Sequence, residues 1–179
     1  AMARKKDTDV HSLYGSLNGG TTVGAATKFM KSSNVHGAIA FAKANKFGSD
    51  VYILHHPNAV AYLSKEAATV AAAATNAIPD GYSADLLKNF WSGLRPLNNV
   101  PIFEDGNLSV DSDDDATGVI ASKGAMAVLN SVETRTERQR DASLRATEVV
   151  MTSDYGVFEL DDTKGAGFIL DAAALSTSA

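Results

Sequence analysis

Apolar residues recur every three or four positions in several stretches of the chain, which is the spacing of a helix that buries one face. The helices predicted in this way span residues 1–18, residues 35–47, a stretch that begins at Pro57, and residues 83–93. The first ends at two glycines, Ser33 or Asn34 is expected to cap the second, and proline suits the first turn of the third. The residues expected to face inward are Val10, Leu13, Tyr14, Leu17, Val35, Ala38, Ile39, Ala42, Val60 and Leu63.

Short apolar runs, rich in β-branched and aromatic residues, predict strands. These runs are Val51–Leu54, read as a central buried strand, Val100–Phe103 and Thr117–Ala121. Residues 125–129 fit either a strand or a short helix, and residues 20–34 are rich in Gly, Thr and Ser and read as a loop. A hairpin is predicted between residues 155–160 and 166–171, because a polar turn of five residues joins them. Helices and strands together predict an α/β or α+β class.

The segment Val132–Asp141 alternates like a strand but has no apolar face. One side carries Glu133, Arg135, Glu137, Gln139 and Asp141, and the other carries Thr134, Thr136, Arg138 and Arg140. Such a strand cannot form the centre of a core. It fits an edge protected by charge, or a surface on which a second copy docks through ion pairs. The candidate contact residues are therefore Glu133, Arg135, Glu137, Arg138, Arg140 and Asp141.

Composition limits the classes of function. The 179 residues are 45% hydrophobic, which suffices for one domain, or one domain with a smaller attached layer. A net charge of −5 argues against nucleic-acid binding as the main task, since phosphate recognition needs a surplus of Lys and Arg. The chain has no cysteine, hence neither disulfides nor thiolate chemistry. It has no signal-peptide pattern and no apolar run of membrane-spanning length.

An acidic loop has part of the pattern of a calcium site. Asp111, Asp113 and Asp115 occupy positions one, three and five of such a loop. Position six is Ala116 where the turn needs glycine, and position twelve is Ser122 where a bidentate Glu is required. The segment is therefore interpreted as a solvated acidic loop, with a metal-dependent enzyme kept as an alternative.

Two adjacent histidines, His55 and His56, end the predicted central strand, a frequent position for catalytic groups in open α/β sheets. Neighbouring strand residues point to opposite faces, and Ala59 and Val60 stand four positions further on, where a second ligand would be expected. A capping or core-edge role is favoured over metal binding or acid–base catalysis. We predict no catalytic residue, no metal ligand and no cofactor.

The order of these features resembles the C-terminal portion of tailed-phage major capsid proteins with the Hong Kong 97-type fold. The resemblance covers residues 5–171 and rests on loose motifs in a matching order. These are Asp7 with Leu13-Tyr14, the strand that runs into His56-Pro57, Val100-Pro101-Ile102-Phe103 after Gly93, Ala125-Met126-Ala127, Glu137-Arg138-Gln139-Arg140-Asp141 and Tyr155-Gly156-Val157.

The resemblance implies an α+β fold with a spine helix, peripheral-domain strands, and an axial domain built on a central sheet with flanking helices. Residues 1–34 would be the end of the spine helix and its connection. Residues 35–130 would be the axial domain, 131–154 a charged strand of the peripheral domain, and 155–179 a return hairpin and tail. The family carries an N-terminal arm and an extended loop before the spine helix. The sequence is therefore expected to be incomplete or to be an unusually short shell protein.

The implied function is structural. Copies of the protein would assemble as hexamers and pentamers into an icosahedral capsid around packaged double-stranded DNA, with portal and other head proteins as further partners and no membrane. The protein would be found in the virion after assembly in the host cytoplasm. Two alternatives stay open beside the metal-dependent enzyme. One is an encapsulin-like nanocompartment shell that encloses an enzyme, and the other is a monomeric interaction domain.

Overall fold

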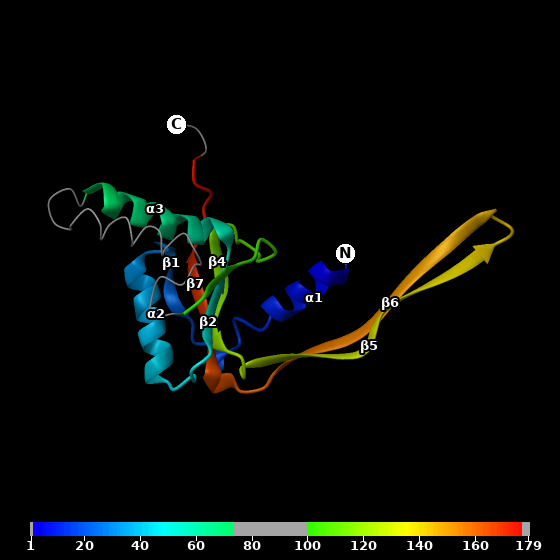
Figure 1. Ribbon diagram of the computed structural model, residues 1–179, viewed down its shortest axis with the longest axis horizontal. Coiled ribbons are helices and arrows are strands. Elements are labelled where there is room, and N and C mark those ends of the chain that lie inside the picture. The colour runs from blue at the N-terminus through cyan, green and yellow to red at the C-terminus, as the bar shows by residue number, and fades with distance from the viewer. Residues whose placement is uncertain (1, 74–99, 177–179) are drawn as a thin grey trace.

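The computed structural model describes residues 2–73 and 100–176 and has two parts, a layered sheet and a long projecting hairpin (Figure 1). A five-stranded sheet has the order β1-β7-β4-β2-β3, and β5 and β6 form a sheet of their own. The strands are β1 Val23–Phe29, β2 Val51–His55, β3 Ile102–Glu104, β4 Asp115–Ser122, β5 Met126–Asp141, β6 Ala146–Glu159 and β7 Gly165–Asp171. The helices are α1 Met2–His11, α2 Ser32–Ala44 and α3 Pro57–Ala73, and 3-10 turns span Asn18–Gly20 and Asp162–Lys164.

Strand β4 lies in the middle of the large sheet and is buried on both faces over nearly its whole length. It pairs antiparallel with β2 on one side and with β7 on the other. The predicted strands at Thr117–Ala121 and Val51–Leu54 are both confirmed, although β4 rather than β2 is the central one. Pro101 precedes the edge strand β3, as expected for a residue that has no N–H to donate.

Helices α2 and α3 cover one face of this sheet. The four residues of α2 predicted to face inward, Val35, Ala38, Ile39 and Ala42, are all buried, as are Val60 and Leu63 of α3. The predicted cap of α2 is wrong. The helix begins at Ser32, and neither Ser33 nor Asn34 caps it through its side chain. The carboxylate of Glu66 in α3 instead accepts a hydrogen bond from the Ser32 N–H at 2.6 Å, so a neighbouring helix provides the cap.

The opposite face of the sheet is covered by the segment that follows α1. Tyr14 and Leu17 are buried there against Val119 and Ala121 of β4. The helix predicted over residues 1–18 is shorter than expected, since the α-helix ends at His11 and turns follow. The Ser12 and Ser16 hydroxyls donate to backbone carbonyls in this region and so compete with the helical hydrogen-bond ladder.

Two further expectations are wrong. Residues 20–34 are not simply a loop, because they contain β1, an edge strand that pairs parallel with β7. Residues 155–160 and 166–171 do not form a hairpin with each other, because β6 pairs with β5 while β7 enters the large sheet. The ambiguous residues 125–129 mostly belong to the start of β5. The predicted helix at 83–93 lies outside the described residues.

Within the described residues, no helix combines the length and apolar character needed to cross a membrane.

Candidate interaction surface

The β5–β6 hairpin projects from the large sheet as a two-stranded ribbon (Figure 1). Almost all of its outer part is exposed on both faces, and the described chain places no third strand beside it. Each strand therefore keeps one edge of unpaired backbone groups, which a neighbouring molecule can approach. The hairpin runs from Met126 to Glu159, so the charged segment expected at residues 131–154 is its outer portion. The predicted charged strand is thus confirmed as extended over residues 132–141 and as exposed over nearly all of them, but the prediction of a single strand over 131–154 is wrong, because the chain turns after Asp141 and returns as β6.

The pairing register assigns each outer side chain to one of two faces. Two irregularities interrupt β5 between Asn130 and Arg135, but the pairing is continuous from Arg135↔Thr152 to Asp141↔Ala146. Directly opposed residues of an antiparallel pair share a face, and successive residues alternate. One face, called the acidic face below, consists of Arg135, Glu137, Gln139, Glu148, Val150 and Thr152. The basic face consists of Thr136, Arg138, Arg140, Thr147, Val149 and Met151.

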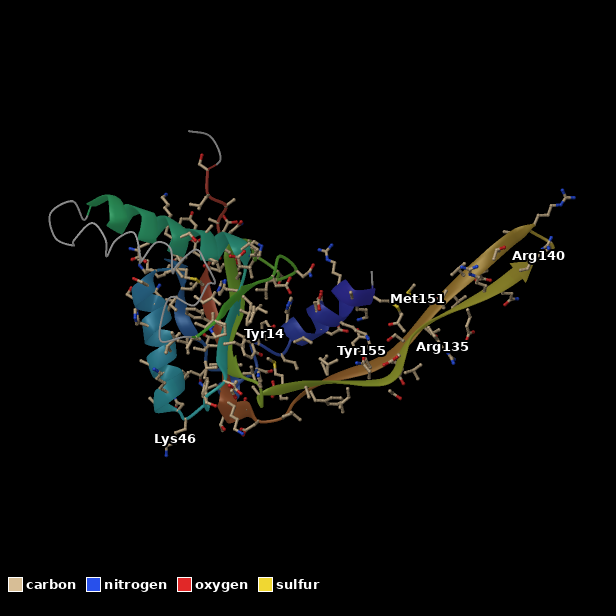
Figure 2. The ribbon with its side chains drawn as sticks, viewed as in Figure 1. Tyr14, Lys46, Arg135, Arg140, Met151 and Tyr155 are labelled. Atoms are coloured by element: carbon tan, nitrogen blue, oxygen red, sulfur yellow. The ribbon has the colours of Figure 1, made fainter. Side chains whose placement is uncertain are left out.

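The sequence pattern therefore placed the β5 residues correctly from Arg135 to Asp141, whereas Glu133 lies within the interrupted part of the register. Figure 2 shows Arg135 and Met151 on opposite sides of the ribbon and Arg140 near its tip. The β6 residues Glu148, Val149 and Met151 were not among the predicted contacts. Only the register of the partner strand reveals on which face they stand.

The turn at the tip is held by Asp141. Its carboxylate accepts hydrogen bonds from the Ser143 hydroxyl at 2.6 Å and from the N–H groups of Ser143 and Leu144 at 2.9 and 3.3 Å. These bonds, led by that of the Ser143 hydroxyl, lower the pKa of Asp141. Of the six predicted contact residues, Asp141 therefore has a role inside its own chain.

Helix α1 is fixed to the root of the hairpin by polar contacts. The Tyr155 hydroxyl donates to the Asp9 carboxylate at 2.5 Å, and Lys5 lies 3.0 Å from the same carboxylate. The hydrogen bond to Tyr155 is the main cause that lowers the pKa of Asp9, and it raises the pKa of Tyr155. Lys6 stands over the Tyr155 ring and donates to the Asn130 side chain at 3.0 Å. These contacts hold α1 against the root of the hairpin.

Tyr155→Phe is expected to loosen α1, because it removes the hydrogen bond to Asp9 and keeps the ring beneath Lys6. Amide hydrogens of α1 should exchange about threefold faster, a modest effect because the bond is open to water. Hydrogen-exchange mass spectrometry measures this directly. Tyr62→Phe is the control, since that ring stacks on Phe29 in the large sheet. Unchanged exchange in α1 would mean that the remaining contacts suffice to hold the helix.

The acidic loop has a structural use. The Asp111 carboxylate accepts the N–H groups of Asp113 and Asp115 at 2.9 Å each, which closes the turn before β4. Asp115 is buried, and its carboxylate accepts the Thr27 N–H of β1 at 2.6 Å. Asp111 and Asp113 are exposed, as expected for a solvated loop. In the described part of the chain, no group of three or more His, Asp or Glu side chains is arranged to hold a metal ion.

The two histidines have different structural roles. His55 is fully buried, where its Nε2 lies 3.1 Å from the Phe168 carbonyl oxygen and its Nδ1 accepts the His56 N–H at 2.9 Å. The neutral ring with its proton on Nε2 satisfies both contacts. The Nδ1 of His56 accepts the Asn58 N–H at the start of α3. The predicted capping or core-edge role is confirmed, with His56 as the cap and His55 in the core.

No protein-family model matches the sequence, and neither does any curated protein. Solved structures do resemble the fold. A structure from Mycobacterium phage Che8 matches with a TM-score of 0.60 and 18% identity, over 93% of this chain and 58% of that one. The holo-SrpI encapsulin complex from Synechococcus elongatus PCC 7942 matches with a TM-score of 0.60 and 11% identity, over 99% of this chain and 65% of that one. The chain thus spans about three fifths of the length of these neighbours.

These matches extend along nearly the whole chain and include both the layered sheet and the hairpin. The chain has an α+β fold of the Hong Kong 97 type, as the resemblance of its motifs implied.

Proposed function

We propose that this protein is a shell-forming structural protein, whose copies assemble with one another into a closed particle. The observation that carries the proposal is the similarity, over 93% and 99% of the chain, to a structure from a phage and to an encapsulin complex. A closed shell uses many copies of one chain in symmetric contacts, so that modest pairwise contacts give a stable container.

The hairpin supports this proposal by its shape and its charge. A two-stranded ribbon exposed on both faces buries little surface in its own chain, and isolated ribbons of this kind are marginally stable in water. Contacts with neighbouring copies would stabilise it. In this proposal α1 is the end of the spine helix, and the hairpin belongs with it in a peripheral domain. The large sheet with α2 and α3 is the axial domain.

More specifically, we propose a viral capsid protein that forms hexamers and pentamers and encloses double-stranded DNA, with portal and other head proteins as further partners. A net charge of −5 suits an inner wall that encloses DNA without binding it tightly. The second candidate is a nanocompartment shell that encloses an enzyme, and the similarity to the encapsulin complex favours it equally. Both candidates use the protein as a container, with no reaction of its own.

Imaging of the native material tests the proposal. After size-exclusion chromatography, the protein is expected to elute as a large assembly and to appear as closed icosahedral particles in negative-stain electron microscopy. Nuclease-protected double-stranded DNA inside the particles would support the capsid, and a protein cargo would support the nanocompartment. A protein that stays monomeric would contradict both and favour the interaction domain. A melting temperature that falls on chelation would instead revive the metal-dependent enzyme.

A further inference from the structure

The two faces of the outer hairpin differ in charge. The basic face carries Arg138 and Arg140 and no acidic residue. On the acidic face Glu137 and Glu148 outnumber Arg135, and Asp141 adds a further carboxylate at the turn. The outer hairpin is therefore polarised in charge across its thickness.

The charged groups on these faces are largely free to bind another molecule. Arg138, Arg140 and Glu148 are exposed, and they make no side-chain hydrogen bond or ion pair with any residue in the described part of the chain. Among the residues that the structure describes, the Glu137 carboxylate forms an ion pair only with Arg135, at 3.4 Å, and both side chains are exposed. Such a pair contributes little to stability and exchanges readily for another.

Apolar side chains stand between these charges on both faces. Val149 and Met151 are 56% and 53% exposed on the basic face, and Val150 is 43% exposed on the acidic face. Val149 and Met151 stand two positions apart in β6 and therefore share a face, where both can contact one partner. An interface that buried them would gain hydrophobic stabilisation while the charges set orientation and register.

We propose that the hairpins of neighbouring copies stack on each other, with the basic face of one against the acidic face of the next; this rests on the proposed shell function. Arg138 and Arg140 of one copy pair with Glu137 and Glu148 of its neighbour, and the valines and Met151 pack between them. The occupant is a second copy because a single chain carries both complementary faces.

The stacking is directional. Two basic faces in contact would bring four arginines together, and two acidic faces would bring four glutamates together. Contacts between like faces are therefore disfavoured by charge repulsion. A contact between unlike faces is heterologous, and heterologous contacts repeat head to tail, closing into a ring where the rotation between copies allows it, as a closed shell requires. The polarity of the hairpin therefore selects cyclic groups of copies over isolated two-fold pairs.

Charge reversal with rescue tests this contact. Arg138→Glu/Arg140→Glu and, separately, Glu137→Lys/Glu148→Lys are each expected to lower the yield of particles at least about tenfold. The four changes combined reverse both faces and restore their complementarity, so the yield should return to within about threefold of the wild type. Thermal melting of unassembled protein should be unchanged in every variant, because these side chains are exposed.

A matched control separates facial complementarity from total charge. Arg138→Glu/Arg140→Glu combined with Glu104→Lys/Asp113→Lys has the net charge of the wild type, but the two lysines lie on exposed positions outside the hairpin. This variant should assemble as poorly as the arginine reversal alone. Rescue by it would overturn the proposal in favour of net charge. An effect of the arginine reversal with none of the glutamate reversal would overturn it in favour of contact with DNA.

The experiments distinguish failure of the proposed contact from failure of the proposed shell function. A normal particle yield in both the arginine reversal and the glutamate reversal would contradict the stacking of hairpins but not the shell function. If the wild type forms no particles, the shell function fails. The contact is then measured as salt-dependent self-association by sedimentation velocity, and a monomer at every salt concentration overturns it too.

Discussion

Replacement of Gly118 by alanine is expected to lower the free energy of unfolding by about 3 kcal/mol or more, among the largest effects of any single methyl group. Gly118 lies in the central strand β4, beside β2. A Cβ at this position would stand 2.3 Å from the Leu54 carbonyl oxygen and 2.6 Å from a ring carbon of His55. The carbonyl is backbone inside the sheet and cannot rotate away, so β2 and β4 would have to separate locally.

Urea unfolding of the purified variant, followed by circular dichroism, measures this loss. Gly37→Ala is the matched control, because Gly37 lies within α2 and a Cβ there meets nothing within 4 Å. The same added methyl group should raise stability at Gly37 by about 0.5–1 kcal/mol, since alanine is the better helix former. An unfolding midpoint of Gly118→Ala equal to that of the wild type would contradict the close packing of β2, β4 and the His55 ring.

Features that depend on local sequence were predictable. Helix α2, the start of α3 at Pro57, and strands β2 and β4 each carry their own signal, either a helical spacing of apolar residues or an unbroken apolar run. Burial of the α2 and α3 residues predicted to face inward follows from that signal alone, because only one side of each helix can meet the sheet, whereas Val10 and Leu13 are only partly buried. The cap of α2 was not predictable, since Glu66 comes from a segment more than thirty positions away.

The choice of strand partners was not predictable from local pattern. Strand β7 follows β6 after a short polar segment and so looked like its hairpin partner. Ala166, Phe168 and Leu170 are fully buried, and such a strand needs a place inside a sheet. Its glycines allow this, because a Cβ on Gly167 would stand 2.7 Å from the Tyr14 carbonyl oxygen. The 3-10 turn at Asp162–Lys164 separates the two strands.

The β5 half of the candidate interface was predictable from the sequence, and the β6 half was not. Alternation along β5 identified the charged residues and divided them between two faces. That division puts Arg138 and Arg140 on the side opposite Glu137, but it leaves open on which face the residues of β6 stand. The register places Glu148 opposite Gln139, on the face of Glu137, and this leaves Arg138 and Arg140 without an acidic neighbour on theirs. The polarity of the whole hairpin thus depends on pairing between strands, which the sequence of β5 alone does not give.

Acidification is expected to remove about 3 kcal/mol of stability through His55 alone. Burial lowers the pKa of His55 from 6.5 to about 4, although the hydrogen bond to Phe168 acts in the opposite direction. His55 is therefore protonated near pH 6.5 in the unfolded chain, whereas in the folded protein it stays neutral until the pH approaches 4. The contribution of His55 is complete above pH 6.5 and is lost progressively as the pH falls toward 4.

The structural reason is that a protonated His55 could not keep its contacts. The Nδ1 of His55 accepts a hydrogen bond from the His56 N–H. A proton on that nitrogen would turn it into a donor, so that two N–H groups would face each other. No solvent reaches the ring to compensate. Burial also lowers the pKa of His56, so both histidines favour the folded state less below pH 6.5, and their contributions must be separated by substitution. Asp9, Asp141 and Asp161 have pKa values below 3.8, so their contributions fade at lower pH.

Urea unfolding at a series of pH values between 6.5 and 4 measures how steeply the free energy of unfolding changes with pH. His55→Gln preserves a donor for the Phe168 carbonyl and an acceptor for the His56 N–H, and it cannot titrate. The free energy of unfolding of this variant should fall less steeply as the pH falls. The difference in slope should correspond to about one proton fewer taken up on unfolding, whatever the stability of the variant at neutral pH. His36→Gln is the matched control, because it makes the same replacement at a histidine that is exposed on α2. If His55→Gln and the wild type lose stability in parallel, then His55 takes up its proton in the folded state, and its ring is not enclosed by the sheet.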